Sequence, residues 1–142
     1  MAPPHKARKR FGQHFLEPAW IAKIIAAVAP QPGETFLEVG PGRGQLTEPL
    51  ARAGAVVHAV EIDRDLVAAL RMRDLPNVHV HEGDFLDVPP ETWFQGGQPY
   101  RMAANLPYNV STPILGRLLA HARAGRLADA FLMLQKEVAD RL

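Results

Sequence analysis

The chain has 142 residues, 47% of them hydrophobic, with 16 Lys and Arg against 15 Asp and Glu, and it contains no cysteine. This composition predicts one globular domain and excludes disulfide frameworks and thiolate chemistry. No apolar run approaches the roughly 20 residues that cross a bilayer, and the basic N-terminus lacks the apolar core of a secretory signal, so we expect no membrane partner.

The N-terminal residues are strongly basic. Residues 1–23 carry five Lys and Arg against one Glu, whereas acidic side chains outnumber basic ones in the rest of the chain. Such asymmetry suggests a polyanionic partner, because basic side chains bind phosphates independently of sequence. A solvated tail is the alternative, and charge alone does not choose between the two. The cluster consists of Lys6, Arg8, Lys9 and Arg10. We expect residues 1–12 to form a basic arm and residues 13–142 to form one domain.

Strands and helices are predicted to alternate from Pro18 onwards. Pro18 suits the first turn of a helix with apolar residues at helical spacing, and Pro30 ends that helix. Short apolar runs predict buried strands at residues 35–39, 56–62, 78–81, 101–105 and 130–134. Amphipathic stretches predict helices from residue 45 or 46 to 53, at 64–73, from 111 to about 124, and from 135 on, whereas 87–99 reads as a loop. This alternation predicts an α/β fold with a mostly parallel sheet.

The first predicted strand ends in the glycines Gly40, Gly42 and Gly44. Glycines at such a turn let a ligand approach the main chain closely. The spacing departs from the dinucleotide fingerprint Gly-x-Gly-x-x-Gly, because position 45 is Gln. Glu61 ends the next apolar run, about 20 residues on, where a carboxylate can bind a ribose. A ribose-containing ligand without a pyrophosphate, such as S-adenosylmethionine, fits both features. A turn that serves only tight packing is the alternative.

Asp84 follows the third predicted strand, at the sheet edge where open α/β sheets bind ligands. It can accept a hydrogen bond from an adenine amine, and Phe85 can pack on the ring. The alternative is that Asp84 caps the following turn, as Asp commonly does. In the same strand, His79 and His81 share one face. Because no Cys, Asp or Glu lies at ligand spacing, we expect solvent-facing or hydrogen-bonded histidines and no metal.

Asn105, Leu106, Pro107 and Tyr108 follow the fourth predicted strand. An adenine amine is a poor nucleophile because its lone pair is delocalised into the ring. The Asn105 amide oxygen and a backbone carbonyl of Leu106 or Pro107 can accept its hydrogens and direct the lone pair towards an electrophile. Tyr108 offers a flat face for the base. Since a sulfonium methyl is already activated, positioning can supply most of the catalysis. An ordinary strand-to-helix turn is the alternative.

Together these motifs resemble the ribosomal RNA adenine dimethyltransferases of the KsgA type, in order from about Lys9 to the last residue. The motifs are Arg10-Phe11-Gly12-Gln13-His14-Phe15-Leu16, Leu37-Glu38-Val39-Gly40-Pro41-Gly42-Arg43-Gly44, Glu61-Ile62-Asp63, Gly83-Asp84-Phe85 and Asn105-Leu106-Pro107-Tyr108-Asn109. Five motifs in one order make the resemblance specific.

The resemblance implies a Rossmann-like class I methyltransferase that uses S-adenosylmethionine, with helices on both faces of the sheet. It implies N6-dimethylation of two adjacent adenosines near the 3′ end of small-subunit ribosomal RNA, in the cytoplasm, by a protein that is monomeric at full length. Position 14 is His here, where the family more often has Asn. The implied cofactor residues are Gln13, His14, Leu16, Gly40, Gly42, Glu61, Ile62, Asp84, Phe85 and Asn105. Asn105, Leu106, Pro107 and Tyr108 would face the target adenine.

Family members continue beyond this chain with further strands and a small helical domain. We therefore expect an N-terminal fragment that is inactive on its own and whose last predicted strand forms an uncovered edge of the sheet. Three rivals remain. A nucleotide-binding oxidoreductase would need the missing glycine spacing, a large-subunit RNA dimethyltransferase of the antibiotic-resistance type shares the motif order, and a non-enzymatic ribosome-assembly factor would tolerate loss of Asn105.

Overall fold

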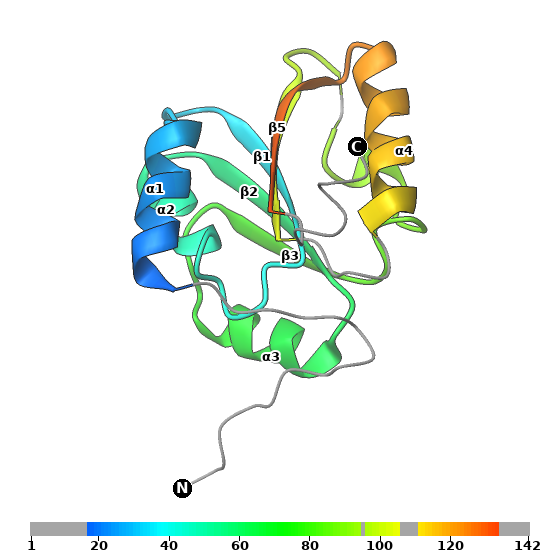
Figure 1. Cartoon of the computed structure of the whole chain (residues 1–142). Coiled ribbons are helices and arrows are strands. Elements are labelled where there is room, and N and C mark those ends of the chain that lie inside the picture. Colours follow the sequence, from blue (N-terminus) through cyan, green and yellow to red (C-terminus); the bar gives the residue numbers. More distant parts are fainter. Residues whose placement is uncertain (1–16, 95, 106–110, 134–142) are drawn as a thin grey trace, which may run out of the picture.

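The computed structural model of the chain describes residues 17–94, 96–105 and 111–133, and at positions 111 and 112 it describes the backbone only. Five parallel strands form one sheet in the order β3-β2-β1-β4-β5 (Figure 1). The strands are β1 (Thr35–Val39), β2 (Val56–Glu61), β3 (Val78–Glu82), β4 (Tyr100–Asn105) and β5 (Leu127–Met133). The helices are α1 (Pro18–Val28), α2 (Thr47–Arg52), α3 (Arg64–Met72) and α4 (Ser111–Arg123), with a 3-10 turn η2 at Pro90–Thr92. The predicted Rossmann-like α/β arrangement is confirmed.

Local sequence signals set the helix boundaries. Pro18 begins α1, and Ala29 ends it in the left-handed conformation at φ 46°. Pro49 lies in the first turn of α2, where its missing N–H leaves no helical hydrogen bond unmade. The side chain of Asp63 caps α3 by accepting a hydrogen bond of 2.9 Å from the amide of Asp65. The predicted helices are confirmed to within about two residues at these ends.

Two apolar clusters pack on opposite faces of the sheet, and Figure 1 shows α1 and α2 on one side with α4 on the other. The first joins Leu37 of β1 and Met102 of β4 to Ile114 of α4. The second joins Phe36 of β1 to Leu50 of α2. Burying one such large apolar side chain contributes about 1.5–3 kcal/mol. The second cluster therefore holds α2, and with it the turn that precedes it, against β1.

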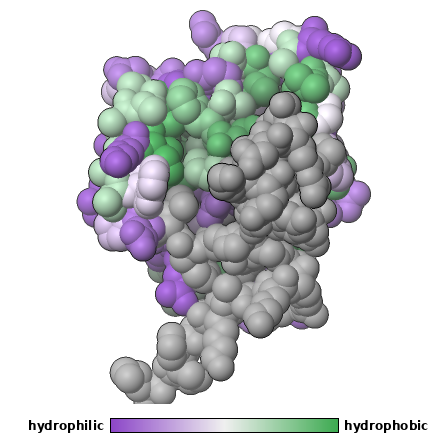
Figure 2. Space-filling model, in the orientation of Figure 1, coloured by the Kyte–Doolittle hydropathy of each residue, from purple (hydrophilic) through white to green (hydrophobic). Residues whose placement is uncertain are grey.

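The fifth strand differs from its prediction. It begins at Leu127, three residues before the predicted start, and it lies at the edge of the sheet, as expected for the last strand of this chain. Asp129 and Ala130 are exposed, and Phe131 is only half-buried. The apolar composition predicted burial, but in the described part of the chain β5 has a strand neighbour on one side alone. Figure 2 shows apolar side chains gathered over the upper half of the molecule, where this strand lies.

The connection between β3 and β4 is less irregular than predicted. Within the stretch 87–99, expected to be a loop, residues 90–92 form the 3-10 turn η2. Trp93 follows it and packs against Phe85 with ring centroids 5.6 Å apart.

No helix among the described residues is long and apolar enough to span a membrane.

Candidate functional site

The candidate site lies where the strand order reverses. The chain passes outward from β1 to β2 and β3, then crosses back to β4 on the other side of β1. In open parallel sheets a ligand crevice forms at such a point, beside the carboxyl ends of the strands. Gly40, directly after β1, lies against the end of β4, since a Cβ atom at Gly40 would stand 3.1 Å from the carbonyl oxygen of Asn105. The predicted meeting of these two strand ends is confirmed.

The glycine turn has a backbone conformation that residues with a side chain rarely adopt. Gly40, Gly42 and Gly44 have φ angles of 71°, 58° and 86°, all in the left-handed region. The amide of Gly40 donates a hydrogen bond of 2.9 Å to the carbonyl oxygen of Val60 in β2. The amide of Gly44 donates one of 2.9 Å to the carbonyl oxygen of Pro41, within the turn. The turn is therefore anchored both to the neighbouring strand and to itself.

Glu61 joins three strand ends. Its Oε1 atom accepts a hydrogen bond of 3.1 Å from the amide of Gly42, and its Oε2 atom accepts one of 2.9 Å from the amide of Asp63. Its carbonyl oxygen accepts a hydrogen bond of 2.9 Å from the amide of Gly83, after β3. Burial raises the pKa of Glu61 above its ordinary value, although the backbone hydrogen bonds act in the opposite direction. Because each carboxylate oxygen has two lone pairs, further donors such as ribose hydroxyls remain chemically possible.

Sequence reasoning overlooked Glu38. This residue of β1 is 1% exposed, and the buried hydroxyl of Thr47, at the start of α2, donates a hydrogen bond to its carboxyl group. Burial raises the pKa of Glu38 to about 8, and the negative charge of Glu61 acts in the same direction. The carboxyl is therefore mostly protonated at neutral pH and links β1 to α2 across the turn. The presence of an acidic residue in an otherwise apolar strand was the feature of the sequence that could have pointed to Glu38.

At the end of β3 the structure favours the capping interpretation of Asp84. Its Oδ1 atom accepts a hydrogen bond of 2.9 Å from the amide of Leu86 and closes the following turn. Phe85 is 2% exposed and packs against Trp93 and the guanidinium of Arg117, whose carbon lies 4.8 Å from the ring centroid. Stacking of Phe85 on an adenine is therefore disfavoured by burial, whereas contact of Asp84 with a cofactor stays a prediction.

Other predicted site residues have different positions. Ile62 follows Glu61 at the end of β2 and is 42% exposed, so its side chain is accessible beside the turn. Asn105 is the last residue of β4. The rest lie outside the described residues: Leu106, Pro107 and Tyr108, the segment residues Gln13, His14 and Leu16, and the arm residues Lys6, Arg8, Lys9 and Arg10.

The histidines of β3 pair with a third histidine that sequence reasoning did not consider. His58 of β2 hydrogen-bonds to His81 through Nδ1 and Nε2 at 3.1 Å, and its ring stacks on that of His79 with centroids 4.9 Å apart. The expected hydrogen-bonded histidine is thus confirmed for His81. Burial, together with the charges of His79 and His81, lowers the pKa of His58 to about 4. Within the described ranges no group of three or more His, Cys, Asp or Glu could hold a metal ion.

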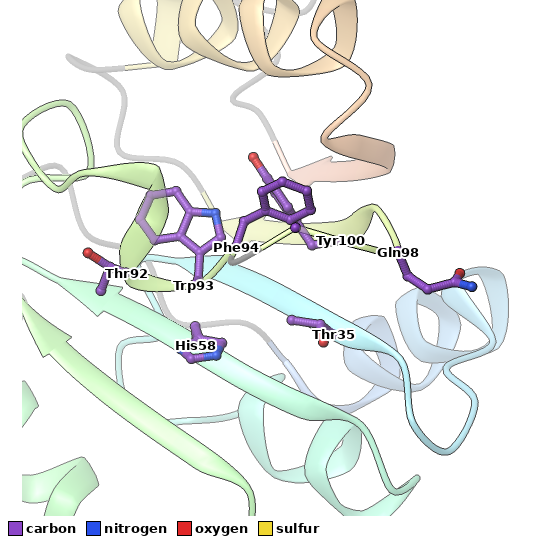
Figure 3. Close-up of a pocket in the computed structure, with 8 residues that line it drawn as sticks. Thr35, His58, Thr92, Trp93, Phe94, Gln98 and Tyr100 are labelled. Atoms are coloured by element: carbon purple, nitrogen blue, oxygen red, sulfur yellow. The ribbon is translucent and has the colours of Figure 1, made fainter.

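A separate cavity of about 300 Å³ lies at the opposite end of the strands. Figure 3 shows Thr35, the first residue of β1, and Tyr100, the first of β4, beside Trp93 and His58. Because Thr35 and Tyr100 are the first residues of their strands, this cavity lies at the amino ends of the strands and is distinct from the crevice at the glycine turn.

The comparisons with known proteins agree with one another. The family model described as ribosomal RNA adenine dimethylase matches residues 4–142. The ribosomal RNA small subunit methyltransferase A of Aromatoleum aromaticum is 50% identical over 140 residues, which are 97% of this chain and 51% of that relative. The protein of the same name from Methylococcus capsulatus is 46% identical over 141 residues, 97% of this chain and 54% of the relative. The chain thus spans about half the length of the curated relatives it matches.

Solved structures give the same picture. A dimethyladenosine transferase from Plasmodium falciparum is 31% identical with a TM-score of 0.74, over 88% of this chain and 44% of that one. The 23S rRNA methyltransferase ErmE is 29% identical with a TM-score of 0.76, over 89% of this chain and 50% of that one.

Proposed function

The chain belongs to the ribosomal RNA adenine dimethylase family, and from this membership we propose that it serves in methyl transfer from S-adenosylmethionine to the N6 atoms of two adjacent adenosines near the 3′ end of small-subunit ribosomal RNA. Its fold is that of the class I S-adenosylmethionine-dependent methyltransferases. One observation of the structure carries the proposal: the ends of β1, β2 and β4 meet at the point where the strand order reverses.

We assign the cofactor to this crevice. The methionine part would lie along the turn at Gly40 and Gly42, because these glycines carry no side chain of their own that would keep a ligand from the main chain. The carboxylate of Glu61 would accept the ribose hydroxyls, and Asp84 would accept a hydrogen bond from the adenine amine. Ile62 is exposed next to Glu61 and would contact the adenosine. The remaining residues that we assign to the cofactor are Gln13, His14, Leu16 and Asn105, whereas we do not assign the Phe85 ring, which is buried against Trp93.

The chemical step needs positioning more than acid–base chemistry. S-adenosylmethionine would supply an activated sulfonium methyl to the N6 atom of adenine. A new N–C bond would form, the electron pair of the broken S–C bond would stay on sulfur, and N6 would release a proton to solvent. Asn105 ends β4, and its backbone carbonyl lies against Gly40, so we assign its side chain to the crevice where the amine would accept the methyl group. We propose that its amide oxygen and a carbonyl of Leu106 or Pro107 accept the amine hydrogens, with Tyr108 stacked on the base.

We also propose the division into a basic arm, residues 1–12, and a cofactor-binding domain, residues 13–142. Lys6, Arg8, Lys9 and Arg10 would contact RNA phosphates, because their charge is concentrated in one short segment. A ribosomal substrate implies a cytoplasmic location, and we expect the full-length protein to act as a monomer.

A large-subunit substrate is the second candidate, because the likeness to ErmE is as close in TM-score as the likeness to the dimethyladenosine transferase. The names of the curated relatives favour the small subunit. The test is methyl incorporation by the full-length protein into isolated small and large ribosomal subunits. We expect label in N6-dimethyladenosine of the small subunit, and label in the large subunit alone would favour the second candidate.

A further inference from the structure

Arg73 connects two elements that are distant in sequence. It follows α3 directly, and its Nη1 atom donates a hydrogen bond of 2.8 Å to the carbonyl oxygen of Arg43 in the glycine turn. Its Nη2 atom pairs with the carboxylate of Glu48, in the first turn of α2. One planar guanidinium therefore binds both the turn and the helix that follows it. A single ammonium group could not reproduce this forked geometry.

The third glycine of the turn makes room for this contact. A Cβ atom at Gly44 would stand 2.5 Å from Nη1 of Arg73 and 2.8 Å from Cδ1 of Leu70. Leu70 lies in the last turn of α3, and Arg73 follows that helix. Gly44 thus serves packing between the turn and Arg73, in addition to its φ of 86°. The turn is held on two sides, by Glu61 at Gly42 and by Arg73 at Arg43.

We propose that Arg73 is a positioning residue, which holds the glycine turn in the shape that receives the cofactor without touching the cofactor itself. The inference rests on the proposed function, because the turn is the cofactor site only if that assignment holds. Small displacements at a binding site are costly when the ligand must approach the main chain closely. Loss of Arg73 would remove the hydrogen-bond donor that the Arg43 carbonyl and the Glu48 carboxylate share, and would loosen the turn.

Arg52 supplies a matched control. It pairs with the same carboxylate, Glu48, from four residues along α2, but it is 78% exposed, and among the described residues it makes no hydrogen bond or ion pair to the turn. Arg73→Met and Arg52→Met each remove one arginine partner of Glu48 and keep an unbranched apolar side chain. Only Arg73→Met also removes the hydrogen bond to the Arg43 carbonyl oxygen in the turn. Arg73→Lys keeps the charge without the fork.

The experiment combines two readouts on the chain and its three variants. Amide hydrogen exchange without ligand measures the opening of residues 40–46, and calorimetry measures the dissociation constant of S-adenosylhomocysteine. We expect Arg73→Met to speed exchange in that segment and to weaken binding, each about tenfold. Arg52→Met should stay within about twofold of the parent, and Arg73→Lys should fall between the two.

Each contrary outcome has a separate meaning. Unchanged exchange at residues 40–46 in Arg73→Met, or equal effects of Arg73→Met and Arg52→Met, would overturn the positioning role. Faster exchange throughout the sheet, with a lowered Tm, would overturn it as well, because Arg73 would then be a general structural residue. A parent chain that binds no S-adenosylhomocysteine would overturn the proposed function, and the cofactor role of Arg73 with it.

Discussion

The backbone amide of Gly42 donates a hydrogen bond to the Oε1 atom of Glu61 at 3.1 Å, although 19 residues separate them in the chain. The carboxylate at the end of β2 therefore shapes the turn after β1, in addition to any contact with a ligand. A change at Glu61 would remove the ribose acceptor and one anchor of the turn together.

Glu61→Ala should weaken S-adenosylmethionine binding by about 1–3 kcal/mol, because it leaves the ribose hydroxyls and the amide of Gly42 without their acceptor. Calorimetric titration measures the loss. Glu82→Ala is the matched control, since Glu82 lies beside Glu61 in the register of β2 and β3 but is exposed. Equal affinities for the parent and Glu61→Ala would remove Glu61 from the site.

The buried carboxyl of Glu38 makes stability depend on pH. Its pKa is about 8 in the folded chain and has the ordinary value near 4.5 in the unfolded chain. Between these values the folded state binds more protons, so the free energy of unfolding falls as the pH rises. The stabilising contribution is fully present below about pH 4.5 and is lost as the pH passes 8.

Glu38→Gln should remove this dependence, because an amide does not titrate and its oxygen can still accept the hydrogen bond from Thr47. Thermal unfolding between about pH 5 and pH 8 should show a flatter decline of Tm in the variant than in the parent. Glu82→Gln, at an exposed position, should keep the slope of the parent. Identical slopes for Glu38→Gln and the parent would show that Glu38 is not the titrating group.

The local patterns of the sequence predicted the strands and the residues at their carboxyl ends. Gly40, Glu61 and Asn105 could be placed at one crevice because parallel strands share a carboxyl edge. The contact of Arg73 with the turn could not be predicted from the sequence, since it depends on where the end of α3 lies relative to α2. The edge position of β5 was expected from the resemblance and not from apolar composition, because burial depends on neighbours and not on the strand itself.

Asn105→Ala in the full-length protein should mainly lower the rate constant of methyl transfer. The hydrogen bond to the amine matters most when the nitrogen becomes tetrahedral, so binding of S-adenosylmethionine should change less than the rate. Single-turnover kinetics with small ribosomal subunits measure the step. Asn105→Asp keeps an acceptor oxygen and should retain more activity than Asn105→Ala. A rate of methyl transfer that is the same in Asn105→Ala as in the parent would show that Asn105 does not have the proposed role.

Replacement of the four basic residues of the arm by Ala should reduce the salt dependence of RNA binding, because fewer phosphate counterions are released. The changed residues are Lys6, Arg8, Lys9 and Arg10. The slope of log affinity against log salt concentration gives the number of phosphate contacts. A second variant with Lys23, Arg52, Arg64 and Arg123 replaced by Ala, all at exposed helix positions, removes the same charge and serves as the control. An unchanged slope in the arm variant would mean that the arm is a solvated tail.

The central claim is that the crevice at Gly40, Glu61 and Asn105 binds S-adenosylmethionine rather than a dinucleotide. Parallel calorimetric titrations of the chain with S-adenosylmethionine and with NADH test it most directly. We expect saturable binding of S-adenosylmethionine at one site, weakened in Glu61→Ala, and no measurable heat from NADH. Binding of NADH, or binding of S-adenosylmethionine that Glu61→Ala leaves unchanged, would contradict the account.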